Sequence, residues 1–183
     1  GNNIRKAFEK CIYPHVSSFG VPGYTIREAI YEDAGIIFDA IDKNRDDLRT
    51  WLPFVDGLKS VGDEQAFLSS SLQVPYEERD IVYMIEKGKS ICGLIGFHFS
   101  DRANHRTEIG YWLLPEYRGM HLQYEMMQTA ERKLHKEGYR YLLCTVHPEN
   151  KFSRENVKRQ GYKKILTKEK YGGFLRDIWM KKL

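Results

Sequence analysis

Residues 122–137 carry the strongest helical signal in the chain. The apolar residues of this stretch recur at the spacing of one helix face: Leu122, Met126, Met127, Ala130 and Leu134. Gly138 follows at a position that is typical of a helix end. A helix with one apolar face has to bury that face against another layer of structure. The fold therefore has to supply such a layer from the flanking segments.

Segments with a β-type pattern lie on both sides of this helix. The predicted strands are 24–29, 81–86, 90–99, 107–113, 141–146, 162–166 and 174–180. Further helices are predicted at 31–41, 46–51, 62–72 and 150–160. The order predicts an α+β domain over residues 23–183 that contains a three-strand meander. Residues 1–22 are expected to form an N-terminal extension.

The composition excludes several classes of protein. The chain has 183 residues, 42% of them hydrophobic, which suits one buried core. The formal net charge of +4 is too small to indicate a nucleic-acid-binding protein, and the apolar runs are too short for a membrane span. Cys11, Cys92 and Cys144 lack the spacing of a zinc site. We therefore expect free thiols, no metal and a reducing, cytoplasmic setting.

The turn before the long helix has two interpretations. It joins the strand 107–113 to the helix through Arg118 and Gly119. A helix start presents unpaired N–H groups and the positive end of the helix dipole, which suit a diphosphate. Arg118 could add a charge-assisted hydrogen bond. An ordinary turn in which glycine relieves backbone strain explains the same residues.

Two other stretches also allow a structural and a functional interpretation. Asn150 and Ser153 stand at a predicted helix start, where both residue types commonly act as caps. Alternatively, Asn150 bonds an amide-rich ligand beside the sheet, and the Ser153 hydroxyl reaches the terminal atom of that ligand. Trp51 and Phe54, on either side of a Leu-Pro pair, either close a helix end in the core or line a substrate groove.

Taken in order, these stretches resemble the GNAT superfamily of acetyl-CoA-dependent N-acetyltransferases, and within it the branch that acetylates ribosomal-protein N-termini. TWLPF resembles the Trp-Leu-Pro motif of that branch. EIGYWLLPEYRGMHLQYEMMQTA resembles its strand, pyrophosphate loop and following helix, and HPENKFSRENVKRQGYKK resembles its Asn-x-x-Ser helix. Gly172-Gly173 before Arg176-Asp177 resembles its closing hairpin. The implied fold is a central mixed, mostly antiparallel sheet flanked by helices, with splayed central strands.

The resemblance implies acetyl transfer from acetyl-CoA to a primary amine, most simply a protein or peptide N-terminal α-amine of the ribosomal-protein type. It implies these residues for binding acetyl-CoA: Leu113, Arg118, Gly119, Met120, His121, Leu122, Gln123, Asn150 and Ser153. Trp51, Phe54 and Tyr111 are expected to contact the acceptor. Members of this branch often form dimers, so the resemblance makes the final strands a candidate contact surface for a homodimer and leaves the oligomeric state open.

The resemblance also suggests roles in the chemistry. Ser153 matches the position that protonates the leaving thiolate, and Glu169 lies where the branch has a candidate base, with Glu108 as the alternative. We expect the strands 93–99 and 108–113 to splay, so that a backbone N–H stabilises the oxyanion and pantetheine adds to the exposed strand edge. An α-amine, with a pKa of roughly 7.7–8.0, deprotonates more easily than a lysine at about 10.4, so a weak base favours N-terminal acceptors.

One departure from the family pattern leaves alternatives open. The two small positions of the family loop hold His121 and Gln123. Three outcomes follow for His121: it turns outward and the loop still binds, its ring donates to the phosphate, or binding is lost. One alternative function is the same chemistry on a polyamine, an amino acid or an antibiotic. Acidic residues would favour a cationic acceptor of that kind: Asp46, Asp47, Asp56, Asp63 and Glu64. The other alternative is a degenerate GNAT fold that binds without catalysis.

Overall fold

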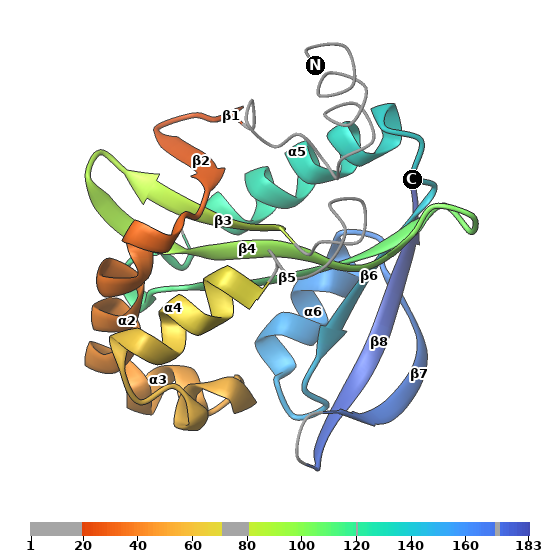
Figure 1. Cartoon of the computed structure of the whole chain (residues 1–183). Coiled ribbons are helices and arrows are strands. Elements are labelled where there is room, and N and C mark those ends of the chain that lie inside the picture. Colours follow the sequence, from red (N-terminus) through yellow and green to blue (C-terminus); the bar gives the residue numbers. More distant parts are fainter. Residues whose placement is uncertain (1–19, 71–80, 120, 171–172) are drawn as a thin grey trace.

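A computed structural model describes residues 20–70, 81–119, 121–170 and 173–183. The described residues form one eight-stranded sheet in the order β1-β2-β3-β4-β5-β6-β8-β7, with helices packed on it (Figure 1). The β5–β6 pairing is parallel, and the other described pairings are antiparallel. The predicted α+β fold with a mixed, mostly antiparallel sheet is therefore confirmed, including the meander of β3, β4 and β5.

The elements follow the predicted order. The strands are β1 Gly20–Val21, β2 Tyr24–Glu28, β3 Ile81–Lys87, β4 Ser90–Asp101, β5 Arg106–Leu113, β6 Tyr141–Val146, β7 Lys163–Lys170 and β8 Phe174–Lys182. The α-helices are α2 Ala34–Lys43, α3 Arg45–Arg49, α4 Val61–Ser70, α5 Leu122–Lys136 and α6 Lys151–Arg159. Three short 3-10 turns complete the set: η2 Tyr31–Asp33, η3 Pro53–Gly57 and η6 Pro115–Tyr117.

The start of the chain differs from the prediction in two respects. Gly20–Val21, which fell within the predicted extension, pairs with β2 as a two-residue strand too short for any sequence pattern to reveal. The predicted helix 31–41 begins with the 3-10 turn η2. The remainder of the extension, residues 1–19, lies outside the described residues, as do residues 71–72 of the predicted helix 62–72.

The sheet separates two hydrophobic clusters, because neighbouring side chains of a strand point to opposite faces. Tyr83 and Ile85 of β3 pack in the cluster that contains α5, while Met84 between them packs with α2. The predicted apolar face of α5 is buried, and each of its five residues is at most 1% exposed. The long helix therefore closes one face of the sheet, and α2 and α3 close the other.

The strands that separate are β5 and β6, so the predicted splay of β4 from β5 is wrong. The β4–β5 ladder continues from Gly93↔Leu113 to His98↔Glu108. Gly93 permits this close pairing, since a Cβ at that position would overlap the carbonyl of Trp112. The β5–β6 ladder ends at Ile109↔Cys144, while β6 stays paired with β8 as far as Val146↔Asp177. The end of β6 therefore follows β8 and opens a gap beside β5.

Cys92 and Cys144 are free, buried thiols, as predicted. Burial raises the pKa of Cys92 to about 11 and that of Cys144 to about 12, so both stay protonated at neutral pH. Cys11 lies outside the described residues. No helix of the described ranges is long and apolar enough to cross a membrane.

Candidate active site

The turn before α5 keeps a glycine-like backbone. Gly119 has φ +73° and His121 has φ 60° and ψ 0°, so both lie in the left-handed region. Glycine is favoured in that region, and histidine enters it more often than most other residues. The His121 side chain is exposed to solvent. The exposed ring agrees with the first half of one predicted outcome, and binding by the loop stays a prediction.

The N-terminus of α5 opens toward a free space. The N–H of Glu125 donates to the His121 carbonyl at 2.9 Å, so the N–H groups of Leu122, Gln123 and Tyr124 precede this first helical bond. A Cβ placed on Gly119 would meet nothing within 4 Å. Met120 lies outside the described residues. The backbone around His121 therefore fits an anionic group at the positive end of the helix dipole.

Arg118 holds this turn against α3. Its guanidinium donates to both carboxylate oxygens of Asp47, at 3.0 and 2.6 Å, and its Nε donates to the Leu113 carbonyl at 3.0 Å. The charge that was expected to meet a phosphate is therefore matched by a carboxylate of the protein. A bound diphosphate would have to compete with Asp47 for this group.

The gap beside β5 is lined by peptide groups. The N–H of Leu114 donates to the Cys92 carbonyl of β4 at 2.8 Å. Because peptide groups point alternately to the two sides of a strand, those of Leu113 and Tyr111 point toward β6. The ladder with β6 has ended before both residues. Their N–H groups therefore face the gap, where a carbonyl or an extended ligand can accept hydrogen bonds.

Helix α6 borders the same region. The Asn150 side chain accepts a hydrogen bond from the Ser153 N–H at 3.2 Å, so its predicted capping role is confirmed. The half-buried Ser153 hydroxyl forms no hydrogen bond with the described residues. Gln123 accepts a bond from Gln160 Nε2 at 2.7 Å, which joins α5 to α6. Gln123, the second departure from the family loop, thus connects the two helices.

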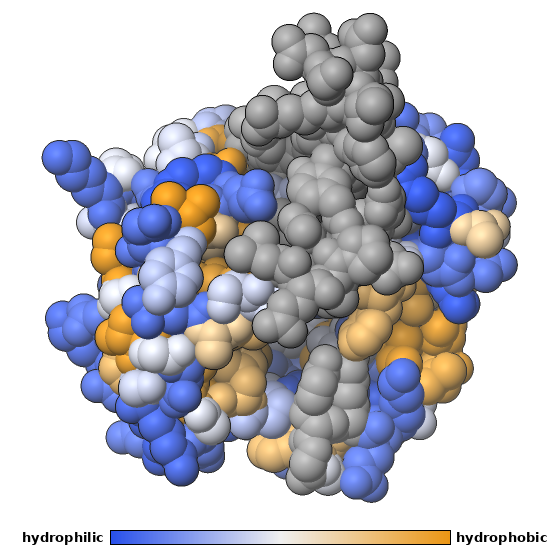
Figure 2. All heavy atoms as spheres, in the orientation of Figure 1, coloured by the Kyte–Doolittle hydropathy of each residue, from blue (hydrophilic) through white to orange (hydrophobic). Residues whose placement is uncertain are grey.

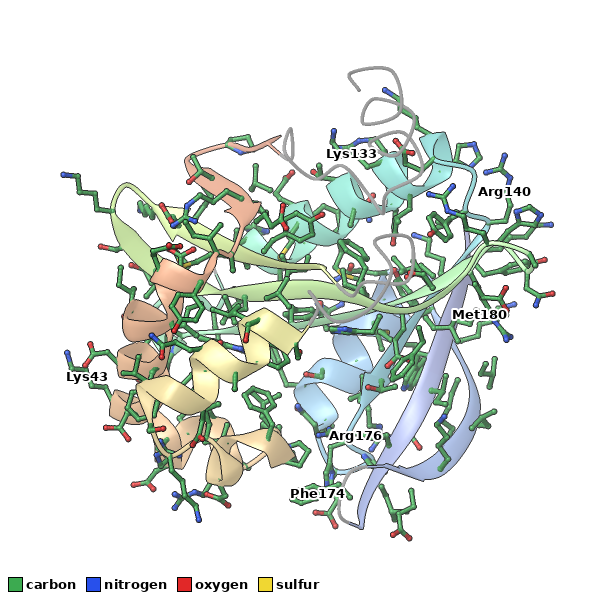
Figure 3. The ribbon with its side chains drawn as sticks, viewed as in Figure 1. Lys43, Lys133, Arg140, Phe174, Arg176 and Met180 are labelled. Carbon is green, nitrogen blue, oxygen red and sulfur yellow. The ribbon has the colours of Figure 1, made fainter. Side chains whose placement is uncertain are left out.

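Three aromatic rings from distant segments meet beyond the end of β6. The Trp51 and His147 ring centroids are 5.2 Å apart, and those of His147 and Phe174 are 6.4 Å apart. The Arg176 guanidinium donates to the Trp51 carbonyl and joins this residue to β8. Figure 3 shows Phe174 and Arg176 at the start of β8, beside the end of the α3–η3 segment. Arg45 steadies that segment by donating to the Leu58 carbonyl at 2.8 Å.

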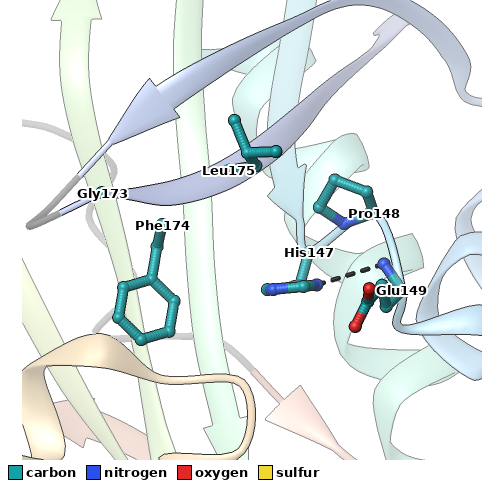
Figure 4. A pocket seen from close by; sticks show the side chains of 6 residues that line it. All are labelled: His147, Pro148, Glu149, Gly173, Phe174 and Leu175. Carbon is teal, nitrogen blue, oxygen red and sulfur yellow. Dashed lines mark hydrogen bonds between the residues drawn. The ribbon is translucent and has the colours of Figure 1, made fainter.

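Two of these rings, His147 and Phe174, border an open hollow of about 380 Å³. Its lining residues are His147, Pro148, Glu149, Gly173, Phe174 and Leu175 (Figure 4). Trp51, a predicted groove residue, contacts the His147 ring of this hollow and does not line it, and sequence reasoning missed His147 and Phe174. The available signal was position, because His147 directly follows the carboxyl end of a strand that pairs in parallel, and ligand sites gather at such ends.

The other predicted residues have different surroundings. Phe54 is 46% exposed. Tyr111 packs against the α5 cluster, and burial raises its pKa, so its hydroxyl stays protonated. Glu108 pairs with Leu143 in the closed part of the sheet. Glu169 is exposed on β7, and its Oε1 would lie 3.7 Å from a Cβ on Gly173, at the rim of the hollow. The structure thus brings Glu169, and not Glu108, to the hollow.

The five acidic residues named for a cationic acceptor do not form an open acidic groove. Asp47 pairs with Arg118, and both Asp46 and Asp56 pair with Arg49. The Asp63 carboxylate accepts the Lys59 N–H at 2.8 Å. Glu64 is only 2% exposed, and burial raises its pKa to about 7. This support for a polyamine acceptor is therefore lost.

Known proteins share both the sequence pattern and the fold. The family model described as acetyltransferase (GNAT) domain matches residues 24–163. YdaF of Bacillus subtilis (strain 168), provisionally described as a ribosomal N-acetyltransferase, is 30% identical over 99 residues, which are 52% of this chain and 52% of YdaF. The chain thus matches about half the length of this curated relative.

Two solved structures share the fold at low sequence identity. The ribosomal L7/L12 α-N-protein acetyltransferase RimL, solved with coenzyme A, has a TM-score of 0.79 and 15% identity over 89% of this chain and 96% of its own. The microcin C7 self-immunity acetyltransferase MccE, solved with acetyl-CoA and AMP, has a TM-score of 0.79 and 18% identity. That match covers 88% of this chain and 93% of MccE.

Proposed function

The chain belongs to the acetyltransferase (GNAT) domain family, and from this premise we propose that it transfers an acetyl group from acetyl-CoA to the α-amine of a protein or peptide N-terminus. The observation that carries the proposal is the gap that opens between β5 and β6 after Ile109↔Cys144. The helix start with left-handed residues 119 and 121 follows β5, and a hollow lies beyond the end of β6. The arrangement offers separate places for an anionic cofactor and an amine.

The residues around the gap fit acetyl-CoA. We assign its diphosphate to the backbone around Gly119, His121 and Leu122, and its pantetheine to the free edge of β5 at Tyr111 and Leu113. Bound acetyl-CoA would supply a thioester carbonyl as the acyl donor. The Tyr111 N–H is available to donate to an oxyanion in this gap. The Ser153 hydroxyl, which has no partner among the described residues, is available to give a proton to a leaving thiolate.

Glu169 is our proposed base. Its carboxylate lies at the rim of the hollow, beside Gly173. An α-amine with a pKa of roughly 7.7–8.0 gives up its proton to a base more easily than a lysine at about 10.4 does. Glu108, which pairs with Leu143 in the β5–β6 ladder and does not line the hollow, remains the second choice.

The acceptor class rests on the relatives. YdaF is provisionally described as a ribosomal N-acetyltransferase, and RimL as one that acts on the α-amine of ribosomal L7/L12. The pairing of Asp46, Asp47 and Asp56 with arginines removes the acidic groove that a polyamine would require. A protein N-terminus, ribosomal or other, is therefore the acceptor that we propose.

An acceptor screen tests the proposal. The protein is incubated with acetyl-CoA and hexapeptides that differ in their first residue, with polyamines and free amino acids as comparison acceptors, and released thiol is measured. We expect turnover with N-terminal peptides and little with polyamines. A preference for polyamines would contradict the acceptor class, and no thiol release above the protein-free rate with any acceptor would contradict catalysis.

We also propose a homodimer through the final strands. The structure supports this in one respect: β7 is an edge of the sheet and exposes Ile165 and Leu166, each 46% accessible. Figure 2 shows hydrophobic surface over this part of the molecule. Light scattering should give twice the chain mass, and Ile165→Lys combined with Leu166→Lys should halve it. A wild-type mass of one chain would contradict the dimer.

A further inference from the structure

His147 stands where the gap between β5 and β6 opens into the hollow. It directly follows Val146, the last residue of β6, and lies beyond the final β5–β6 pair at Ile109↔Cys144. Its ring has the Trp51 ring on one side at 5.2 Å and the Phe174 ring on another at 6.4 Å. The imidazole is thus held by aromatic contacts at the point where an acceptor would enter.

A backbone hydrogen bond defines which nitrogen of this ring carries the proton. The Glu149 N–H donates to His147 Nδ1 at 3.1 Å. A nitrogen that accepts a hydrogen bond has no proton, so the neutral ring carries its hydrogen on Nε2. Figure 4 shows the bonded end of the ring toward Glu149 and the other end directed toward the side of the hollow where Phe174 lies. The hollow therefore receives a hydrogen-bond donor from His147.

The other groups of the hollow suit a peptide N-terminus. Pro148, Phe174 and Leu175 provide apolar surface, and Glu149 lines the hollow while Glu169 lies at its rim. A carboxylate attracts an ammonium group, whereas the Nε2–H of His147 requires an acceptor atom. The first residue of a peptide carries both groups, an amine and a carbonyl oxygen, on adjacent carbons. A polyamine has no carbonyl oxygen for this donor.

We propose that His147 selects N-terminal peptides among amines by donating its Nε2–H to the carbonyl oxygen of the acceptor's first residue. This inference rests on the proposed function and deepens it. It makes His147 a residue that binds and positions the acceptor. The inference does not make His147 the base, because a proton on Nδ1 would bring the Nδ1–H and the Glu149 N–H face to face.

The test uses two acceptors and two variants of the full chain. The acceptors are the best hexapeptide of the screen and the same peptide with its first amide replaced by an E-alkene, which keeps the shape but lacks the carbonyl. His147→Asn keeps an oxygen near the position of Nδ1 and loses the donor at Nε2. His147→Gln places an amide N–H near the position of Nε2. Circular dichroism and the Kd for acetyl-CoA check that each variant is folded.

We expect His147→Asn to lower kcat/KM for the peptide about tenfold, mainly through KM, which is the size of one lost hydrogen bond to a substrate. The alkene peptide should be equally poor with wild type and His147→Asn, and His147→Gln should recover part of the loss. An equal loss of kcat/KM on both acceptors in His147→Asn would overturn the inference. Loss of the acidic limb of the pH profile of kcat/KM in the same variant would also overturn it. Absence of turnover by wild type would overturn the proposed function and this inference with it.

Discussion

The two ends of the gap between β5 and β6 are built in different ways. The proposed cofactor end consists mainly of backbone: a left-handed Gly119, a left-handed His121 and the first N–H groups of α5. The proposed acceptor end consists of side chains from three separate segments, namely Trp51, His147 and Phe174.

This difference explains why His121 is tolerated. A site made of peptide groups depends on backbone dihedral angles, and the φ of 60° at His121 keeps the conformation that a glycine would adopt. A site made of side chains changes with each substitution. We therefore expect cofactor binding to survive substitutions at exposed positions of the turn, and acceptor choice to change with single residues.

The largest effect is expected from a side chain, the Ser153 hydroxyl that is proposed to protonate the leaving thiolate. Ser153→Ala should lower kcat about 100-fold, because a positioned general acid contributes about 10²–10⁴-fold. The Kd for acetyl-CoA should stay within about twofold if the cofactor end is made of backbone. Stopped-flow kinetics and calorimetry measure the two quantities. Ser69→Ala is the matched control, because the Ser69 hydroxyl donates to the Ala66 carbonyl within α4. An unchanged kcat would remove Ser153 from the mechanism.

A second prediction concerns Glu64, which is buried on α4. Burial raises its pKa from 4.5 to about 7, so the folded state binds this proton more tightly than the unfolded state does. The stability that the Glu64 carboxyl contributes is therefore fully present below pH 4.5 and is lost as the pH rises through about 7. Glu64→Gln should raise the free energy of unfolding by up to about 3 kcal/mol at about pH 8.5.

The same Glu64→Gln variant should change little at about pH 3, well below the unfolded pKa of 4.5, where wild-type Glu64 is largely protonated in both states. Urea unfolding at the two pH values measures the difference. Glu155→Gln, on the exposed surface of α6, is the control and should show no pH-dependent gain. An equal gain at both pH values would show that the carboxyl is not the source of the instability.

A third prediction concerns the backbone of the turn at His121. His121→Gly should raise the free energy of unfolding by about 0.5–1 kcal/mol, because glycine adopts the left-handed region without the cost of a Cβ. His121→Ala keeps the Cβ in that region and should give no gain. Neither variant should change the Kd for coenzyme A by more than about threefold. A large loss of affinity in both variants would show that the imidazole itself binds the ligand.

The smallest effect is expected at the ion pair of Arg118 and Asp47, which joins the turn before α5 to α3. Asp47→Asn should cost less than about 1 kcal/mol of stability, as partly exposed pairs do. It should tighten coenzyme A binding about twofold, since Arg118 is released toward the turn. Asp46→Asn, which leaves Arg118 paired, is the control. Weaker binding in Asp47→Asn would mean that Asp47 holds Arg118 in its binding position.

The sequence predicted what local pattern determines. The buried face of α5 and the Asn150 cap were both correct, because helical spacing and capping act within a few residues. The splay was assigned to the wrong strands, because β4, β5 and β6 are all apolar and only the pairing of β6 with β8 decides which pair opens. His147 was missed, because its partners Trp51 and Phe174 are remote in sequence.

The central claim is that the backbone of the His121 turn binds a diphosphate. Calorimetric titration with coenzyme A, compared with pantetheine, which lacks the diphosphate, tests it directly. We predict saturable binding of coenzyme A and a Kd for pantetheine at least about tenfold weaker, because charge-assisted bonds to the phosphates are absent from it. Equal affinities for the two compounds, or no binding of coenzyme A, would contradict the claim.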